Sequence, residues 1–170
     1  MSDEDYSRRC YAYASELIKD IKREYDFCVG GACYPEVHPE AASAEDDLKN
    51  LKNKVDMGVD FLTTQLFCDN EVFYRFMDKL RGAGIEVPVL AGLMPVTSYK
   101  QIGRLVELSG TKLEEGYAEK LEKYKDSDEE VAKISIEYTK KQIEDLISHG
   151  VNGIHLYSMN KVSVAKAIFD

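Results

Sequence analysis

Apolar and polar positions alternate along the chain with two different periods, which predicts a repeated succession of helices and strands. Helical spacing of apolar residues and short apolar runs bounded by turn residues follow one another to the end of the chain. The predicted helices cover residues 4–24, 43–58, 71–82, 98–108, 128–149 and 160–170, with a short helical insertion within 111–127. The predicted strands cover residues 27–33, 59–67, 87–91 and 154–157.

Capping residues support several of these helix boundaries. Ser43, Ser98 and Asn160 stand where an N-cap belongs, because their side-chain oxygens accept hydrogen bonds from the first helical turn. Gly84 and Gly150 follow predicted helices, where glycine tolerates the left-handed backbone that ends a helix.

The regular alternation of strand and helix predicts an α/β fold with a parallel sheet and right-handed crossovers. About four βα units lie between residues 27 and 170, behind the leading helix at 4–24, and we expect residues 1–170 to form a single domain. A closed (β/α)8 TIM barrel needs eight strands and roughly 250 residues. The pattern therefore fits either a small open sheet or half of such a barrel.

Composition narrows the function classes. Apolar residues make up 44% of the chain, charged residues 31%, and the formal net charge is −9, as in a globular protein. Because no basic stripe is visible, we expect no nucleic-acid partner. The acidic balance, and apolar runs far shorter than the roughly 20 residues that span a bilayer, argue against a membrane role. The polar first residues predict no secretory signal.

The cysteines indicate a reduced protein. Cys10, Cys28, Cys33 and Cys68 form no CxxC pair, and the histidines do not group with them as zinc ligands. We therefore expect unpaired thiols, no metal and a cytoplasmic location.

Candidate chemistry follows the predicted strands, since ligands of parallel α/β folds bind beyond the carboxyl ends of the strands. Four segments fall there: residues 34–40, 65–69, 93–97 and 157–161. In the first, two prolines stiffen the loop that carries Tyr34 and His38. A tyrosine ring can stack on a flat ligand and a histidine can donate to a phosphate or carbonyl, but a rigid loop without a ligand fits as well.

The helix after this loop has two stripes. Leu48, Leu51 and Val55 form the apolar one, which predicts the side that faces the sheet. The polar stripe consists of Asp47, Asn50 and Lys54, with Asn53 alongside. Such side chains suit a ribose-phosphate ligand along the helix, although an ordinary solvated face has the same spacing.

Two polar residues lie at predicted strands. Gln65 ends an apolar strand, and its amide can pair both edges of a pterin or a nicotinamide carboxamide, or be satisfied within the core. For His155, inside the last strand, we expect a paired core histidine. Glu36 and Glu40 are weak candidates for general acids, and no nucleophile triad is evident.

Five motifs in order resemble methylenetetrahydrofolate reductase. They are residues 32–41 (ACYPEVHPEA), 47–58 (DLKNLKNKVDMG), 63–67 (TTQLF), 91–96 (AGLMPV) and 155–161 (HLYSMNK). The resemblance implies an FAD-binding (β/α)8 barrel that passes a hydride from NAD(P)H through the flavin to 5,10-methylenetetrahydrofolate, giving 5-methyltetrahydrofolate. It also implies a place in one-carbon metabolism and methionine biosynthesis.

The same resemblance assigns roles to single residues. Tyr34, His38 and Ala41 would line the flavin site, while the polar stripe Asp47, Asn50, Asn53 and Lys54 would reach its ribityl, phosphate or adenosine portion. Gln65 would contact the folate or nicotinamide ring, which take turns at one place. Gln101 and Lys161 would lie near the folate.

Three positions depart from the family pattern. Asn53 stands where many members carry a basic residue, Lys161 stands where arginine is common, and Leu105 occupies a position that is aromatic in some members. Lysine cannot reproduce the planar bidentate contact of arginine.

The family's general acid belongs to the first four βα units, which would precede Met1, so we expect no catalytic residue in this chain and no turnover by it alone. The chain would be part of a longer reductase, with the N-terminal half as its partner. The alternatives are a half-barrel flavin- or folate-binding module that self-associates as a homo-oligomer without catalysis, and a diverged subunit without a ligand.

Overall fold

A computed structural model describes residues 11–170 of the chain; Cys10 and the start of the predicted helix 4–24 lie outside this range. The strands are β1 (Gly30–Cys33), β2 (Phe61–Thr64), β3 (Val89–Leu93) and β4 (Gly153–Leu156). The helices are α2 (Ala14–Glu24), α3 (Ala44–Asp56), α4 (Asn70–Gly82), α5 (Lys100–Ser109), α6 (Glu115–Lys123), α7 (Asp128–Ser148) and α8 (Val162–Phe169). Every element predicted within the described range is present, although its bounds differ by a few residues from the prediction.

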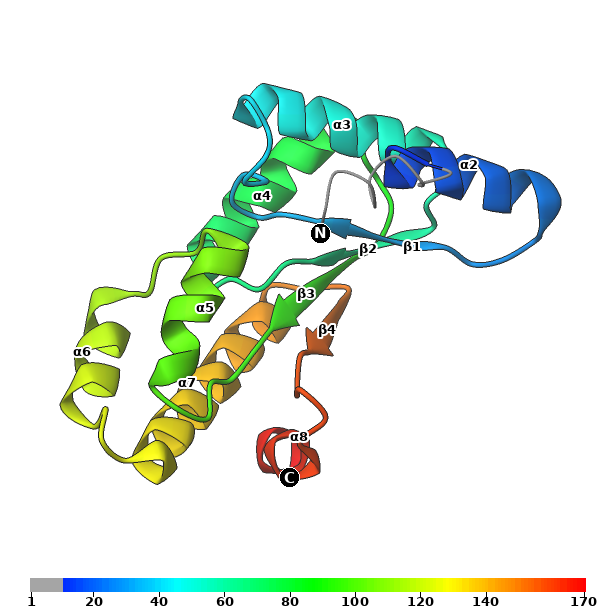
Figure 1. The fold of residues 1–170 in the computed structure, drawn as a ribbon. Helices are drawn as coiled ribbons and strands as arrows, with labels where there is room; N and C mark the ends of the chain where they lie inside the picture. Colours follow the sequence, from blue (N-terminus) through cyan, green and yellow to red (C-terminus); the bar gives the residue numbers. More distant parts are fainter. Residues whose placement is uncertain (1–10) are drawn as a thin grey trace, which may run out of the picture.

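The four strands form one parallel sheet in the order β1-β2-β3-β4, which confirms the predicted α/β class. Figure 1 shows α3 and α4 together on one side of this sheet, with α5 and α6 beyond the end of β3. β1 and β2 pair over four residues, as do β3 and β4, whereas β2 and β3 pair only at Leu62↔Val89 and Thr63↔Leu90.

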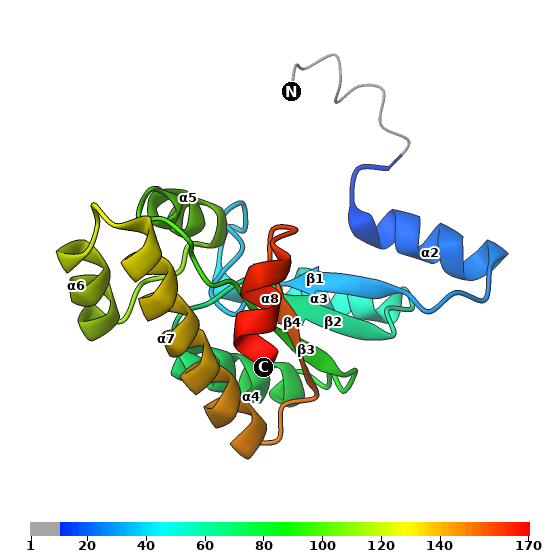
Figure 2. The same ribbon diagram turned by 90° about the horizontal axis from the view of Figure 1, so that it is seen from below.

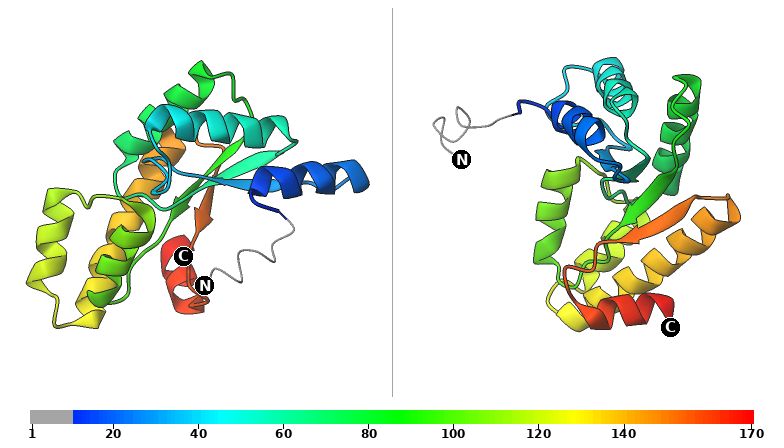
Figure 3. Two further views of the ribbon diagram at one scale, coloured as in Figure 1. Left: turned by 45° about the horizontal axis from the view of Figure 1, so that its top comes forward. Right: turned by 90° about the vertical axis from the view of Figure 1, so that its right-hand side faces the viewer.

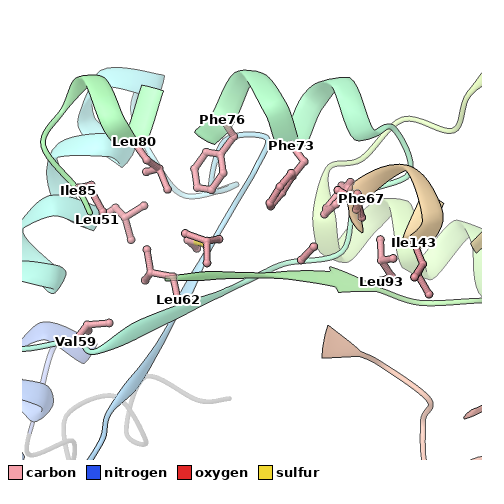
Figure 4. Packing of buried hydrophobic residues seen from close by; sticks show 14 of the residues in the cluster. Leu51, Val59, Leu62, Phe67, Phe73, Phe76, Leu80, Ile85, Leu93 and Ile143 are labelled. Carbon is pink, nitrogen blue, oxygen red and sulfur yellow. The ribbon is translucent and has the colours of Figure 1, made fainter. Parts of the chain in front are cut away.

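The main core fills the space between the sheet and helices α3, α4 and α7. Alternate strand residues such as Leu62 and Val89 are fully buried there, because successive side chains of a strand point to opposite faces. Figure 4 shows the phenylalanines of α4, Phe73 and Phe76, above Leu62. This packing fixes the direction of the carboxyl ends of the strands.

A second cluster joins α5, α6 and α7 and holds the loops that follow β2 and β3. The rings of Tyr117 and Tyr138 stack with their centroids 3.9 Å apart. The Tyr138 hydroxyl donates to the Cys68 carbonyl at 2.7 Å, and the Val96 amide donates to the Ser135 hydroxyl at 2.9 Å. Figure 2 shows these helices gathered at one end of the molecule, away from α2.

The observed ends of the helices confirm some of the predicted capping residues and contradict others. Ser43 caps α3 as predicted, since its hydroxyl accepts from the Asp46 amide, and Gly84 and Gly150 adopt left-handed backbone, with φ of 72° and 73°. The predictions for Ser98 and Asn160 were wrong. Tyr99 precedes α5 and Lys161 precedes α8, each without a capping side-chain hydrogen bond.

The opposite face of the sheet is more open. Ala32 and His155 are exposed on it, and Phe61 and Thr63 are half-buried. The expectation of a core histidine at 155 was therefore wrong: β4 pairs with β3 alone among the described strands, and the His155 ring lies edge-on to Tyr157, with centroids 4.6 Å apart. The right-hand view of Figure 3 shows how the helices are arranged around the strands.

Candidate functional site

A cleft of about 520 Å³ lies where β1 ends, between α3 and the start of α2. All seven residues predicted to bind the cofactor line it. The full lining comprises Tyr13, Ala14, Ser15, Ala32, Cys33, Tyr34, His38, Glu40, Ala41, Asp47, Asn50, Leu51, Asn53 and Lys54. This volume falls within the usual range of small-molecule sites.

Helix α3 provides one wall because its two stripes face different ways. Leu51 is 5% exposed and packs into the core at the inner edge of the cleft, while Asp47, Asn50 and Lys54 are the polar residues of α3 that line it. Residues at i, i+3 and i+7 share one side of a helix. The rotation of α3 that directs its apolar stripe to the core therefore also directs its polar stripe to the cleft. The polar stripe therefore forms one wall of the cleft, and its residue Asn50 is also exposed to solvent. A ligand along this helix stays a prediction.

The proline-containing loop forms the facing part of the cleft. The rings of Tyr34 and His38 meet edge to face with centroids 4.4 Å apart. The His38 amide donates to the Asp47 carboxylate at 3.0 Å, which fixes the loop to α3. The Glu40 amide donates to His38 Nδ1 at 3.1 Å, so Nδ1 acts as an acceptor and the proton of the neutral ring sits on Nε2. That second nitrogen remains for a ligand.

Lys54 and Cys33 meet at the floor of the cleft. The Lys54 amine donates to the Ala32 carbonyl at 2.8 Å. Burial lowers the pKa of Lys54, and the negative charge of Asp47 opposes that shift. Burial raises the pKa of the Cys33 thiol to about 12, so the thiol is neutral at physiological pH and packs as an apolar group.

The start of α2 closes the cleft, and the pattern of the sequence did not indicate this. Tyr13, Ala14 and Ser15 reach the cleft because α2 lies along α3. The Lys22 amine anchors the helix by donating to the Asp60 carboxylate at 2.6 Å and to the Phe27 carbonyl at 2.8 Å. Such contacts between distant segments leave no local signal in a sequence.

Gln65 lies beside the cleft rather than in it. The backbone N–H of Gln65 donates to the backbone carbonyl of Cys33, a residue of the cleft, at 2.7 Å. Its side-chain Oε1 accepts from the Leu66 amide at 3.0 Å, while no described residue accepts from its Nε2. The side chain therefore presents hydrogen-bond donors to a ligand.

Gln101 and Lys161 come together through Thr97, which no local pattern in the sequence singles out. The Thr97 amide donates to Gln101 Oε1 at 2.8 Å, and the Lys161 amine donates to the Thr97 hydroxyl at 2.5 Å. Met159 and Asn160 have φ of 50° and 61°, and the Lys161 amide donates to the Ser158 carbonyl at 2.9 Å. This tight turn carries Lys161 toward the loop after β3.

We call Gln65, Thr97, Gln101 and Lys161 the rim, because they belong to the segments that follow β2, β3 and β4, with Gln101 in the first turn of α5. None of the four lines the cleft. Leu105 is 3% exposed and packs in the cluster of α5, α6 and α7, so an aliphatic residue at this position fills a core.

Within residues 11–170, no group of three or more histidine, cysteine or acidic side chains is arranged to hold a metal ion. No helix of that range has the length and apolar character needed to cross a membrane.

Comparison with known proteins gives one consistent family. A family model described as methylenetetrahydrofolate reductase matches residues 2–170. The chain is 35% identical over 156 residues to 5,10-methylenetetrahydrofolate reductase of Escherichia coli, covering 92% of this chain and 53% of that protein. It is 35% identical over 162 residues to methylenetetrahydrofolate reductase 1 of Schizosaccharomyces pombe, covering 94% of this chain and 27% of that protein. The chain thus spans about half, or less, of the length of these relatives.

A solved structure has a similar fold. It is an uncharacterized protein from Clostridium thermocellum, described as binding two copies of 5-methyl-5,6,7,8-tetrahydrofolic acid. The TM-score is 0.58 with 18% sequence identity, over 91% of this chain and 56% of that one. At this identity the likeness concerns the fold alone.

Proposed function

Because this chain belongs to the methylenetetrahydrofolate reductase family, we propose that it carries the flavin cleft and part of the folate site of an oxidoreductase. The reaction is the reduction of 5,10-methylenetetrahydrofolate to 5-methyltetrahydrofolate at the expense of NADH or NADPH. One observation carries the proposal: the seven residues that the resemblance assigns to the flavin line a single cleft.

The chemistry of the cleft fits FAD. Tyr34 offers a flat ring, and no described residue forms a hydrogen bond with His38 Nε2. Asp47, Asn50 and Lys54 offer partners for hydroxyl and phosphate groups along one helix side. Asn53 extends this wall as a neutral residue, which makes its contribution to binding a phosphate small. When bound, FAD supplies the hydride transfer between the reduced nicotinamide and the folate.

The rim supplies the polar contacts for the substrate in this proposal. The Gln65 Nε2 group donates to a ring carbonyl or nitrogen of the folate and, in alternation, of the nicotinamide. Lys161 uses one donor on Thr97, and no described carboxylate forms an ion pair with it. Its remaining donors suit an anionic group of the folate, with Gln101 beside it.

A second half completes the enzyme in this proposal. The open face of the sheet, the outer edges of β1 and β4, and the length of the bacterial relative support a (β/α)8 TIM barrel of which residues 1–170 form one half as a single domain. The general acid toward the folate then belongs to the other half. The unpaired thiols of Cys28, Cys33 and Cys68 support a cytoplasmic setting.

The open edges also favour a second candidate function, a half-barrel that binds flavin or folate and self-associates without catalysis. Both candidates predict that the purified chain alone does not reduce methylenetetrahydrofolate in a steady-state assay with FAD and NADH or NADPH. Sustained turnover by the pure chain would contradict both.

Titration of FAD into the purified chain, followed by flavin fluorescence, tests the cleft. We expect saturable binding, weakened about tenfold by Lys54→Ala or His38→Ala through loss of one polar contact to the ligand. Lys49→Ala is the matched control, because Lys49 is exposed on the same helix and does not line the cleft. Equal weakening by all three variants, or no binding to the wild-type chain, would contradict an intact flavin cleft.

A further inference from the structure

The pairing of β2 with β3 stops one residue before the end of β2. Their last registered pair is Thr63↔Leu90, and beyond it the Gly92 amide donates to the Thr64 hydroxyl at 2.8 Å instead of to a backbone carbonyl. The Thr64 carbonyl is therefore released from the regular ladder. A buried carbonyl needs a partner, because it has lost its hydrogen bonds to water.

Tyr157 provides that partner from two strands away. Its hydroxyl donates to the Thr64 carbonyl at 3.1 Å, and its amide donates to the Leu93 carbonyl at 2.8 Å. The ring crosses β3 at Gly92, where a Cβ atom would lie 2.9 Å from the Tyr157 ring and 2.2 Å from the Thr64 oxygen. Only a glycine leaves room for this crossing.

The peptide group between Thr64 and Gln65 is consequently held from both sides. Its N–H donates to the Cys33 carbonyl of β1 at 2.7 Å, and its carbonyl accepts from Tyr157 after β4. The half-buried position of Tyr157 raises the pKa of its phenol, which keeps the donor proton in place. The backbone from which the Gln65 side chain projects is thereby fixed by two other strands.

We propose that Tyr157 is a positioning residue. By holding the Thr64–Gln65 peptide group across Gly92, it sets the direction in which the side-chain amide of Gln65 points toward the substrate. This rests on the proposed function in so far as Gln65 contacts the folate. Tyr157 itself touches the backbone and not the reacting atoms. Loss of its hydroxyl loosens Gln65 while the ring remains in place.

The first test needs no ligand. Tyr157→Phe removes only the hydroxyl. We expect the hydrogen exchange of the Gln65 backbone N–H, measured by NMR, to become about five- to tenfold faster. Tyr138→Phe is the matched control, because it removes a similar bond, from a half-buried tyrosine to the Cys68 carbonyl. Unchanged exchange at Gln65 in Tyr157→Phe, or equal acceleration in both variants, would overturn the proposal.

The second test uses 5-methyltetrahydrofolate as the probe with the same purified chains. We expect Tyr157→Phe to weaken its binding about tenfold, and Tyr138→Phe to leave it within about twofold. In a Gln65→Ala background the effect of Tyr157→Phe should disappear, since a residue that acts through Gln65 cannot act without it. A full effect in that background would overturn the proposal.

The exchange and binding measurements distinguish a failure of the positioning role of Tyr157 from a failure of the proposed folate site. If the wild-type chain takes up no folate but Gln65 exchange depends on Tyr157, the positioning role stands and the folate site of the isolated chain fails. If folate binds and Tyr157→Phe changes neither exchange nor affinity, the proposed function stands and the positioning role fails.

Discussion

The cleft and the rim are built in different ways, although both lie at the carboxyl ends of the strands. The cleft takes all its lining from residues 13–54, which comprise α2, β1, one loop and α3. The rim takes Gln65, Thr97 and Lys161 from the segments that follow three strands, and Gln101 from the first turn of α5. One site is thus local in sequence, whereas the other depends on long-range pairing of β2, β3 and β4.

This difference predicts how far a single substitution disturbs each site. The cleft depends on one helix register and one anchored loop, so single side chains there can be removed without disturbing the rim. The rim depends on close backbone contact, above all at Gly92, where β2, β3 and Tyr157 converge. Perturbing the backbone of the rim should therefore cost more than perturbing a side chain of the cleft.

The largest effect is expected for Gly92→Ala. The new Cβ would lie 2.2 Å from the Thr64 oxygen, a backbone atom that cannot move without breaking the sheet. Overpacking of this kind lowers the free energy of unfolding by about 3 kcal/mol, measurable by urea denaturation. Below its melting temperature, the variant should lose folate affinity more than FAD affinity.

Gly103→Ala is the control for this change. Gly103 lies within α5, is exposed, and a Cβ there meets no atom within 4 Å. Alanine is the better helix former, so this variant should gain about 0.5–1 kcal/mol. A Gly92→Ala variant as stable as the wild type would remove the basis for a tight backbone contact beneath the rim.

A smaller effect is expected at the floor of the cleft, from the ionisation of Cys33. The folded thiol has a pKa of about 12 against a reference pKa of 9.0, because burial disfavours the thiolate. The unfolded chain therefore releases this proton first, and stability falls as the pH rises above about 9. At about pH 10, roughly one unit above the unfolded pKa, Cys33 alone accounts for a loss on the order of 1 kcal/mol.

Urea denaturation at about pH 8 and about pH 10 measures this loss. Cys33→Ala should reduce the difference between the two pH values by about that amount. Cys28→Ala is the matched control, because Cys28 is exposed and folding does not remove its thiol from water. If Cys33→Ala and Cys28→Ala change the pH dependence equally, the thiol at the cleft floor is not buried in solution.

Local patterns predicted the cleft far better than the rim. The two stripes of α3 follow from helical periodicity, and the Ser43 cap fixes their register, so periodicity alone grouped Asp47, Asn50 and Lys54 correctly. The family resemblance was needed to indicate Ala41 and to favour a ligand at Tyr34 and His38, since a stiff loop has no period.

What the sequence missed depends on contacts between distant segments. Thr97 and Tyr157 belong to segments that the predicted strand ends indicated, but their hydrogen-bond partners, Lys161 and Thr64, lie 64 and 93 residues away. Serine is a common capping residue, but α5 begins at Lys100, two residues after Ser98. The side chain of Gln101 instead accepts a hydrogen bond from the Thr97 backbone N–H. His155 lies on a strand, but the open face of the sheet leaves it exposed.

The separation of cleft and rim is tested most directly by comparing the FAD affinities of Lys54→Ala and Lys161→Ala. Both substitutions remove a lysine that donates to a single neutral oxygen, one in the cleft and one on the rim. We predict that flavin fluorescence titrations give a dissociation constant about tenfold higher for Lys54→Ala and within about twofold of the wild type for Lys161→Ala. Equal weakening by both substitutions, or a larger effect of Lys161→Ala, would contradict a flavin cleft built from residues 13–54 alone.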